Sequence, residues 1–286
     1  MMCASKIALQ LFVFFGGFGL TAAERRTQEY HQHVLATLGD EADFGESMQA
    51  AKPCPQEEPL KEVLLKLGFK ESELTNLHNM EGVLWEDCKV VEIDLEWRFH
   101  LAGSLSSRFS ELPDLRYLNL YRTKVSGDIE ALKNLRKLQV LNLPSIKVSG
   151  NLLALKSLTK LKELRLYETD VIGDMSALEN LTKLTYFNLH STEVSGDISA
   201  LENLRELEAF SLAYTNVIGD MSALGNLRKL TTLNLHTTKV SGNISALENL
   251  RDLRYLDLAN TNVIGDMSAL ENLRDLRYLD LANTNV

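Results

Sequence analysis

The side chains best suited to chemistry are two histidines, a recurring Gly-Asp pair and a set of recurring serines. His190 and His236 are two repeat units apart, about 10 Å at the spacing of a β-sheet, whereas the ligands of a zinc ion converge on one point. The serines mostly begin helical turns on the side opposite the histidines, so they form no Ser-His-Asp triad. The Gly-Asp pairs lack the dense Asp/Gly alternation of calcium-binding solenoids. We therefore expect no catalytic activity, metal or cofactor.

Composition indicates a folded protein with a negative charge. The chain has 286 residues, of which 45% are hydrophobic and 24% charged, so a mainly disordered state is excluded. Its 39 acidic and 30 basic residues give a net charge of -9. This charge argues against binding to a phosphate backbone, and we expect no nucleic-acid partner.

The elements that position these residues repeat every 23 residues. The unit is LxxLxLxxTxVxGDxSALxNL, and its length lies within the range of known solenoid repeats. One glycine recurs at this interval throughout the second half of the chain, at Gly127, Gly150, Gly173, Gly196, Gly219, Gly242 and Gly265. VIGDM and VSG versions alternate, and residues 246–263 are identical to residues 269–286. The array therefore grew by duplication.

The letters of one unit predict a strand followed by a turn. Alternate residues of a strand face opposite sides, which sends one set into the core: Leu184, Phe187 and Leu189. The other set faces outward: Tyr186, Asn188 and His190. A threonine then occupies the inward turn position, where its hydroxyl satisfies backbone groups that the bend leaves unpaired. This column comprises Thr123, Thr169, Thr192, Thr215, Thr238, Thr261 and Thr284, and Ile146 interrupts it.

The second half of the unit predicts a turn and a short helix. The glycine permits a positive φ or close packing against the neighbouring unit. The Ser-Ala-Leu-Glu sequence, as in Ser176 to Glu179, matches an S-x-x-E capping box, and the preceding Asp is expected to stabilise the helical turn through its dipole. Helical turns are wider than strands, so we expect an arc with a parallel sheet on its concave side.

These features resemble those of leucine-rich repeat proteins from Val91 to Val286. The VSGDI segment is similar to the LxGxIP segment of plant-type extracellular repeats, the SALENL segment is similar to internalin repeats, and Gly82, Val83, Trp85 and Cys88 resemble a plant-type N-terminal cap. The resemblance implies an α/β fold: a leucine-rich repeat solenoid with a curved parallel sheet on its concave face and short helical turns on its convex face. It also implies recognition of a protein or peptide on the concave face, without cofactor or catalysis.

Four regions follow along the chain. Residues 1–23 read as a signal peptide, because Lys6 precedes an apolar run and small residues end the segment at Ala23. Residues 24–58 form an acidic, partly disordered lead-in, 59–90 an N-terminal cap whose apolar spacing predicts a helix ending near Gly68, and 91–286 the solenoid. We expect secretion. The alternative is an uncleaved membrane anchor with the repeats outside.

Modification sites follow from export. Cleavage after Ala23 removes Cys3 and leaves Cys54 and Cys88, for which we predict a disulfide. Asn180 and Asn243 begin N-x-S/T sequences, which are glycosylation acceptors in an exported chain.

The expected function is protein or peptide recognition at the N-terminal half of the concave face, where outward residues are most varied. The candidate ligand-binding residues are Arg116, Tyr117, Asn119, Tyr121, Arg122, Glu163, Arg165, Tyr167, Glu168, Tyr186 and His190. Because the array stops at Val286 without a polar terminal unit, we expect a longer natural chain. One alternative is therefore the truncated ectodomain of a membrane receptor. The longer natural chain would then continue into a membrane span or a receptor kinase. Another is a structural surface-binding array, which would need a uniform outward column of threonines.

Overall fold

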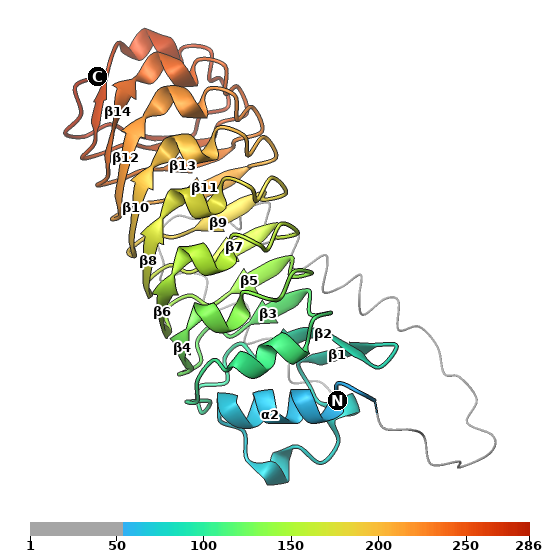
Figure 1. The fold of residues 1–286 in the computed structure, drawn as a ribbon. Helices are drawn as coiled ribbons and strands as arrows, with labels where there is room; N and C mark the ends of the chain where they lie inside the picture. Colours follow the sequence, from blue (N-terminus) through green and yellow to red (C-terminus); the bar gives the residue numbers. More distant parts are fainter. Residues whose placement is uncertain (1–53) are drawn as a thin grey trace, which may run out of the picture. The chain divides into compact units, whose positions relative to one another are not determined.

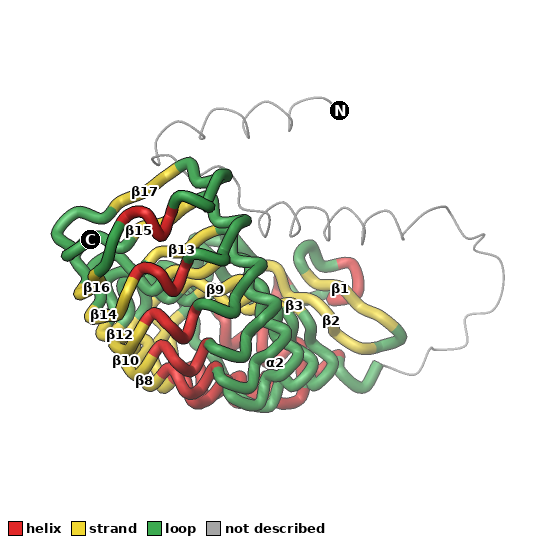
Figure 2. The backbone as a smooth tube through the Cα atoms, turned by 90° about the horizontal axis from the view of Figure 1, so that it is seen from above, coloured by secondary structure: helices red, strands yellow, loops and turns green. Residues whose placement is uncertain are grey.

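The computed structural model describes residues 54–286, which form one compact unit. The predicted signal peptide and the part of the acidic lead-in before residue 54 lie outside the described residues. Successive repeats stack as coils, each advancing the chain by one strand in each of two sheets (Figure 1). Figure 2 shows these two sheets and a row of helical turns on different sides of the stack.

The larger sheet has ten strands, all parallel except for the first pair. Its strands, in spatial order, are β1 (Val83–Glu86), β2 (Lys89–Asp94), β3 (Tyr117–Asn119), β5 (Val140–Asn142), β7 (Glu163–Arg165), β9 (Tyr186–Asn188), β11 (Ala209–Ser211), β13 (Thr232–Asn234), β15 (Tyr255–Asp257) and β17 (Tyr278–Asp280). This sheet is the one that the leucine alternation predicts.

The segments around the recurring glycine form a second, seven-stranded parallel sheet. Its strands are β4 (Ser126–Asp128), β6 (Lys147–Asn151), β8 (Asp170–Asp174), β10 (Glu193–Asp197), β12 (Asn216–Asp220), β14 (Lys239–Asn243) and β16 (Asn262–Ile264). The sequence predicted only a turn here. The difference arises because a glycine inside a short polar segment conceals its strand pairing.

Short 3-10 helices follow the second sheet, as the expected helical turns. They are η3 (Ser107–Glu111), η4 (Ile129–Leu132), η5 (Leu152–Leu155), η6 (Met175–Leu178), η7 (Ile198–Leu201), η8 (Met221–Leu224), η9 (Ile244–Leu247) and η10 (Met267–Leu270). The cap contributes η1 (Glu71–Glu73), η2 (Leu77–Asn79) and the α-helix α2 (Glu57–Leu67). Leucines of the larger sheet and of the helical turns, together with valines of the second sheet, form one continuous core.

The inward residues of the strands are buried as predicted. Leu184, Phe187 and Leu189 are fully buried, and Phe187 stacks on Phe210 of the next coil with ring centroids 5.0 Å apart. The threonine column also matches its prediction: the hydroxyl of Thr192 donates a hydrogen bond to the carbonyl of Leu189 at 2.7 Å. The other threonines of the column do the same.

The predicted Ser-x-x-Glu capping box is wrong. The N-cap of η6 is Asp174, whose side-chain oxygen accepts a hydrogen bond from the backbone N–H of Ser176 at 2.8 Å. Ser176 is therefore already the second residue of the helix, and its hydroxyl is not the cap. The expectation that this aspartate stabilises the helical turn is confirmed, through a direct bond that lowers the pKa of the Asp174 carboxyl.

The recurring glycine is required both by its conformation and by close packing. Gly219 has a φ of +111°, and a Cβ placed there would lie 2.5 Å from a carboxylate oxygen of Asp197, the helix cap of the preceding coil. Gly242 has the same relation to Asp220. Each glycine thus seats its coil on the cap of the coil before it.

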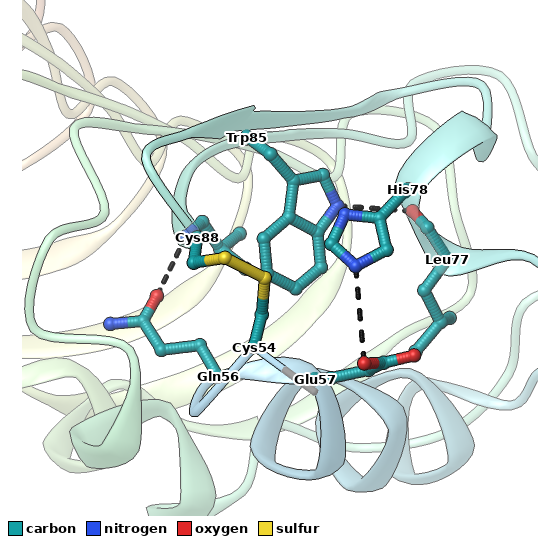
Figure 3. The surroundings of a disulfide bond; sticks show 8 residues. Cys54, Gln56, Glu57, Leu77, His78, Trp85 and Cys88 are labelled. Carbon is teal, nitrogen blue, oxygen red and sulfur yellow. Dashed lines mark hydrogen bonds and ion pairs between the residues drawn. A yellow bond between two sulfur atoms is a disulfide. The ribbon is translucent and has the colours of Figure 1, made fainter. Parts of the chain in front are cut away.

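The N-terminal cap closes the first coil. Helix α2 buries Leu60, Val63, Leu64 and Leu67 and ends at Gly68 in the left-handed conformation. It begins at Glu57, so it includes two residues assigned above to the lead-in. The disulfide between Cys54 and Cys88 forms as predicted, joining the start of α2 to the β1–β2 hairpin (Figure 3). Beside it, the indole of Trp85 donates a hydrogen bond to the carbonyl of Leu77 at 3.0 Å.

This packing predicts opposite effects for two glycine substitutions. Gly219→Ala should lower the free energy of unfolding by about 2 kcal/mol or more, because it combines a positive φ with the contact to Asp197. Gly225→Ala is the matched control: Gly225 ends η8 with a φ of -59°, and other coils carry glutamate at this position. It should leave stability unchanged or raise it by up to about 1 kcal/mol. Urea unfolding of both variants measures the difference, and equal losses would contradict the packing argument.

Candidate functional site

The candidate site is the solvent-facing side of the ten-stranded sheet, here called the sheet face. The parallel register aligns Tyr117 of β3 with Val140, Glu163 and Tyr186 of the following strands. Two positions further along the strands, the register aligns a second column: Asn119, Asn142, Arg165 and Asn188. The predicted residues of β3, β7 and β9 are therefore brought together in two neighbouring columns.

The first coils of the sheet face are held by a network centred on Asn119. Its side-chain amide donates to Asp94 at 3.0 Å and to Glu96 at 3.1 Å. Its side-chain oxygen accepts from the amide of Asn142 at 2.8 Å and from the backbone N–H of Tyr121 at 3.1 Å. Asn119 thus orders the columns around it, and only 2% of its surface is exposed.

Charged and aromatic side chains alternate further along the same face. Arg165 forms an ion pair with Glu163, with 3.0 Å between Nη1 and Oε2, and lies 4.6 Å above the ring centroid of Tyr186. Arg116 pairs with Glu86 of β1 at 2.9 Å. The predicted residues on this part of the face are consequently oriented by one another.

Tyr167 and His190 form a stacked pair at the end of their strands. Their ring centroids are 5.0 Å apart and the planes differ by 10°. Burial raises the pKa of the Tyr167 phenol, and the neighbouring Tyr121 acts in the same direction. Burial also lowers the pKa of His190, while Glu168 acts against that shift. Both rings are therefore uncharged near neutral pH.

The residues next to the turn form an outward column that the repeat alignment reveals, but its left-handed conformation was not predicted: all members have a positive φ between 53° and 63°. Its members are Trp97, Arg122, Ser145, Glu168, Ser191, Tyr214, Thr237, Asn260 and Asn283. We call it the left-handed column. Neighbouring members interact, as where the hydroxyl of Ser145 donates to Glu168 at 2.7 Å. The asparagines of the last two coils were the available signal, since asparagine tolerates this conformation.

Trp97 and Phe99 are additions to the predicted site. Trp97 lies beside Tyr121 and Arg122, with the Trp97 and Tyr121 rings 5.8 Å apart, and Phe99 contacts the Trp97 ring. The two predicted glycosylation residues lie away from this face. Asn180 is exposed next to Glu179, and Asn243 caps η9 by accepting from Ser245 at 2.9 Å. Modification of either stays a prediction.

Within residues 54–286, no helix is long and apolar enough to cross a membrane. In the same residues, no three histidine, cysteine or acidic side chains gather as a metal site would require.

Comparison with solved structures identifies the architecture. No protein-family model and no curated protein matches the chain. The ectodomain of the Arabidopsis thaliana receptor kinase GASSHO1/SCHENGEN3, in complex with CASPARIAN STRIP INTEGRITY FACTOR 2, is 27% identical with a TM-score of 0.72 over 80% of this chain and 30% of its own. The ectodomain of the Arabidopsis receptor kinase HAESA, in complex with an IDA peptide hormone, is 26% identical with a TM-score of 0.69 over 80% of this chain and 41% of its own. The chain has the leucine-rich repeat fold.

This chain spans 30% of the length of the first of those ectodomains and 41% of the second. Listeria monocytogenes internalin C2 is 24% identical, with a TM-score of 0.55 over 82% of this chain and 99% of its own. At that identity the likeness concerns the fold alone. Both halves of the predicted resemblance, plant receptor and internalin, are confirmed.

The stacked pair predicts a dependence of stability on pH. Because the pKa of His190 is lower in the folded chain, the unfolded chain binds a proton there more readily. The contribution of this residue is complete above about pH 6.5 and is lost as the pH falls through the folded-state value. Wild type should therefore lose more stability than His190→Gln between about pH 7.5 and about pH 5.5 in urea unfolding. If the free energy of unfolding of wild type minus that of His190→Gln stays constant or increases on acidification, this prediction is contradicted.

Proposed function

We propose that this chain is an extracellular, non-enzymatic recognition module that binds a protein or peptide on the N-terminal half of the sheet face. One observation carries the proposal: the register collects tyrosine, arginine and histidine side chains of several coils into adjoining columns. Tyrosine and arginine often anchor interfaces, because they bury a large area and still form hydrogen bonds. The last two coils instead present the same Arg, Tyr, Asp, Ala and Asn twice.

The comparisons support binding of this kind. The GASSHO1/SCHENGEN3 and HAESA ectodomains were solved with CASPARIAN STRIP INTEGRITY FACTOR 2 and a peptide hormone, respectively. An extracellular location is supported by their being ectodomains and by the charge, apolar run and small residues that precede Glu24 in this sequence. The Cys54–Cys88 disulfide also suits an oxidising compartment.

A second candidate is the ectodomain of a membrane receptor, for which the likeness to receptor-kinase ectodomains is the specific support. It predicts the same binding face, and it differs in requiring a membrane span downstream. Sequencing of the full transcript beyond the codon for Val286 distinguishes the two. A structural array is disfavoured, because the left-handed column is far from uniform.

The proposed binding face is tested with three tyrosine substitutions. Tyr121→Ala and Tyr167→Ala should each weaken capture of peptides from a synthetic random library by about 2 kcal/mol, the usual scale for an interface anchor. Tyr278→Ala is the matched control, since Tyr278 lies on the same face in the last coil and is 43% exposed. It should change capture little. Equal losses at Tyr278 and Tyr121, or no loss at Tyr121 and Tyr167, would contradict the placement of the site.

A further inference from the structure

Two exposed and two half-buried side chains form a cluster at the start of the left-handed column, and we call them the aromatic–arginine cluster: Trp97, Phe99, Tyr121 and Arg122. Trp97 is 46% exposed and Phe99 is 52% exposed. Their rings meet edge to face with centroids 5.9 Å apart. Two large aromatic side chains that are half exposed and in mutual contact form an apolar patch, which is unusual outside interaction sites.

Arg122 is held in one orientation within this cluster. Its guanidinium carbon lies 4.5 Å from the ring centroid of Trp97 and 5.3 Å from that of Tyr121. Its Nε donates a hydrogen bond to the Tyr121 hydroxyl at 2.8 Å. Among residues 54–286, no carboxylate forms an ion pair with Arg122. The terminal nitrogens of the guanidinium are therefore held in a fixed plane without a partner charge, the arrangement that suits bidentate binding of a carboxylate.

The backbone at this cluster adopts a conformation that disfavours its residues. Trp97 has a φ of 63° and Arg122 a φ of 57°. The last two coils place Asn260 and Asn283 at the same position, and asparagine adopts this conformation at lower cost. A bulky tryptophan here therefore costs stability relative to asparagine.

We propose that the aromatic–arginine cluster binds a single carboxylate that lies next to an apolar side chain of a peptide. Arg122 binds the carboxylate, and Trp97 and Phe99 contact the apolar group. This inference rests on the proposed function and names the chemistry of its ligand. The carboxylate belongs either to an Asp or Glu side chain or to the free C-terminus of the peptide.

The acidic residues beside the cluster limit this ligand to one negative charge. Asp94 is the last residue of β2, and Glu96 immediately precedes Trp97. Both accept hydrogen bonds from the side-chain amide of Asn119. A second acidic group on the ligand would be repelled by these two carboxylates. A polyanion is therefore not the expected ligand.

The experiment measures capture of a random synthetic hexapeptide library by the immobilised full chain. The library is used in two forms, with a free C-terminal carboxylate and with a C-terminal amide. Captured peptides should be enriched in one acidic residue beside an aromatic or aliphatic one. Loss of capture on amidation assigns the carboxylate to the C-terminus, and retention assigns it to a side chain. Capture without any preference for a carboxylate beside an apolar group would overturn the proposal.

Substitutions separate binding from folding. Trp97→Asn should leave stability unchanged or raise it while lowering capture about tenfold or more, the scale of an interface anchor. Arg122→Gln should abolish the acidic preference, and Arg122→Lys should restore it only in part. Tyr214→Asn is the matched control, since Tyr214 is 57% exposed in the same column with a φ of 57°. It should relieve the same backbone strain without changing capture.

Two further results would contradict the account at different levels. If Trp97→Asn and Arg122→Gln bind the peptides as wild type does while Tyr167→Ala loses them, the cluster is not the site, and the proposed function stands. If wild type captures no peptide at all, both the proposed function and this inference are wrong.

Discussion

The structure depends on one constraint: each coil buries its leucines only against its neighbours, so every coil must follow the same backbone path. The glycine in one coil and the aspartate or asparagine cap in the preceding coil meet this requirement together. The cap residue holds the start of a 3-10 helix, as Asp197 does by accepting from Ser199. The glycine of the next coil then packs directly on that cap. A substitution at either position thus affects two coils.

The same constraint separates the scaffold from the binding face. Residues of the core and of the caps repeat nearly unchanged, because their neighbours are copies of themselves. Residues on the sheet face contact one another within a coil and across adjacent coils, outside the shared core, so they vary without disturbing the stack. Variation is greatest in the early coils, where Arg165 pairs with Glu163 and Tyr167 stacks on His190. The last coils keep identical residues, including the stacked Tyr255 and Tyr278.

Sequence periodicity predicted those parts of the fold that a single coil determines. The buried strand residues, the threonine column and the cap helix follow from local patterns, and the Cys54–Cys88 pair follows from elimination. The second sheet was missed, because its pairing involves a strand that contains a glycine. The capping box failed because Asp174, two residues before Ser176, occupies the N-cap position, so the helix begins one residue before the serine. Trp97 was missed because it precedes the first complete repeat, where no column of equivalents marks its conformation.

The central claim is that the coils form an interchangeable scaffold and that the first four coils carry the binding site. A deletion of two later coils tests this claim most directly. Removing residues 202–247 joins Leu201 to Glu248, which are consecutive positions of the repeat, and preserves the alternation of VIGDM and VSG units. The measurement is the affinity of the shortened chain for a peptide captured by the intact chain. The account predicts an affinity within about twofold of the intact chain, because the first three coils keep their neighbours and the fourth, which loses β11, receives the equivalent strand β15 in its place. Loss of binding by a shortened chain that still folds would contradict it.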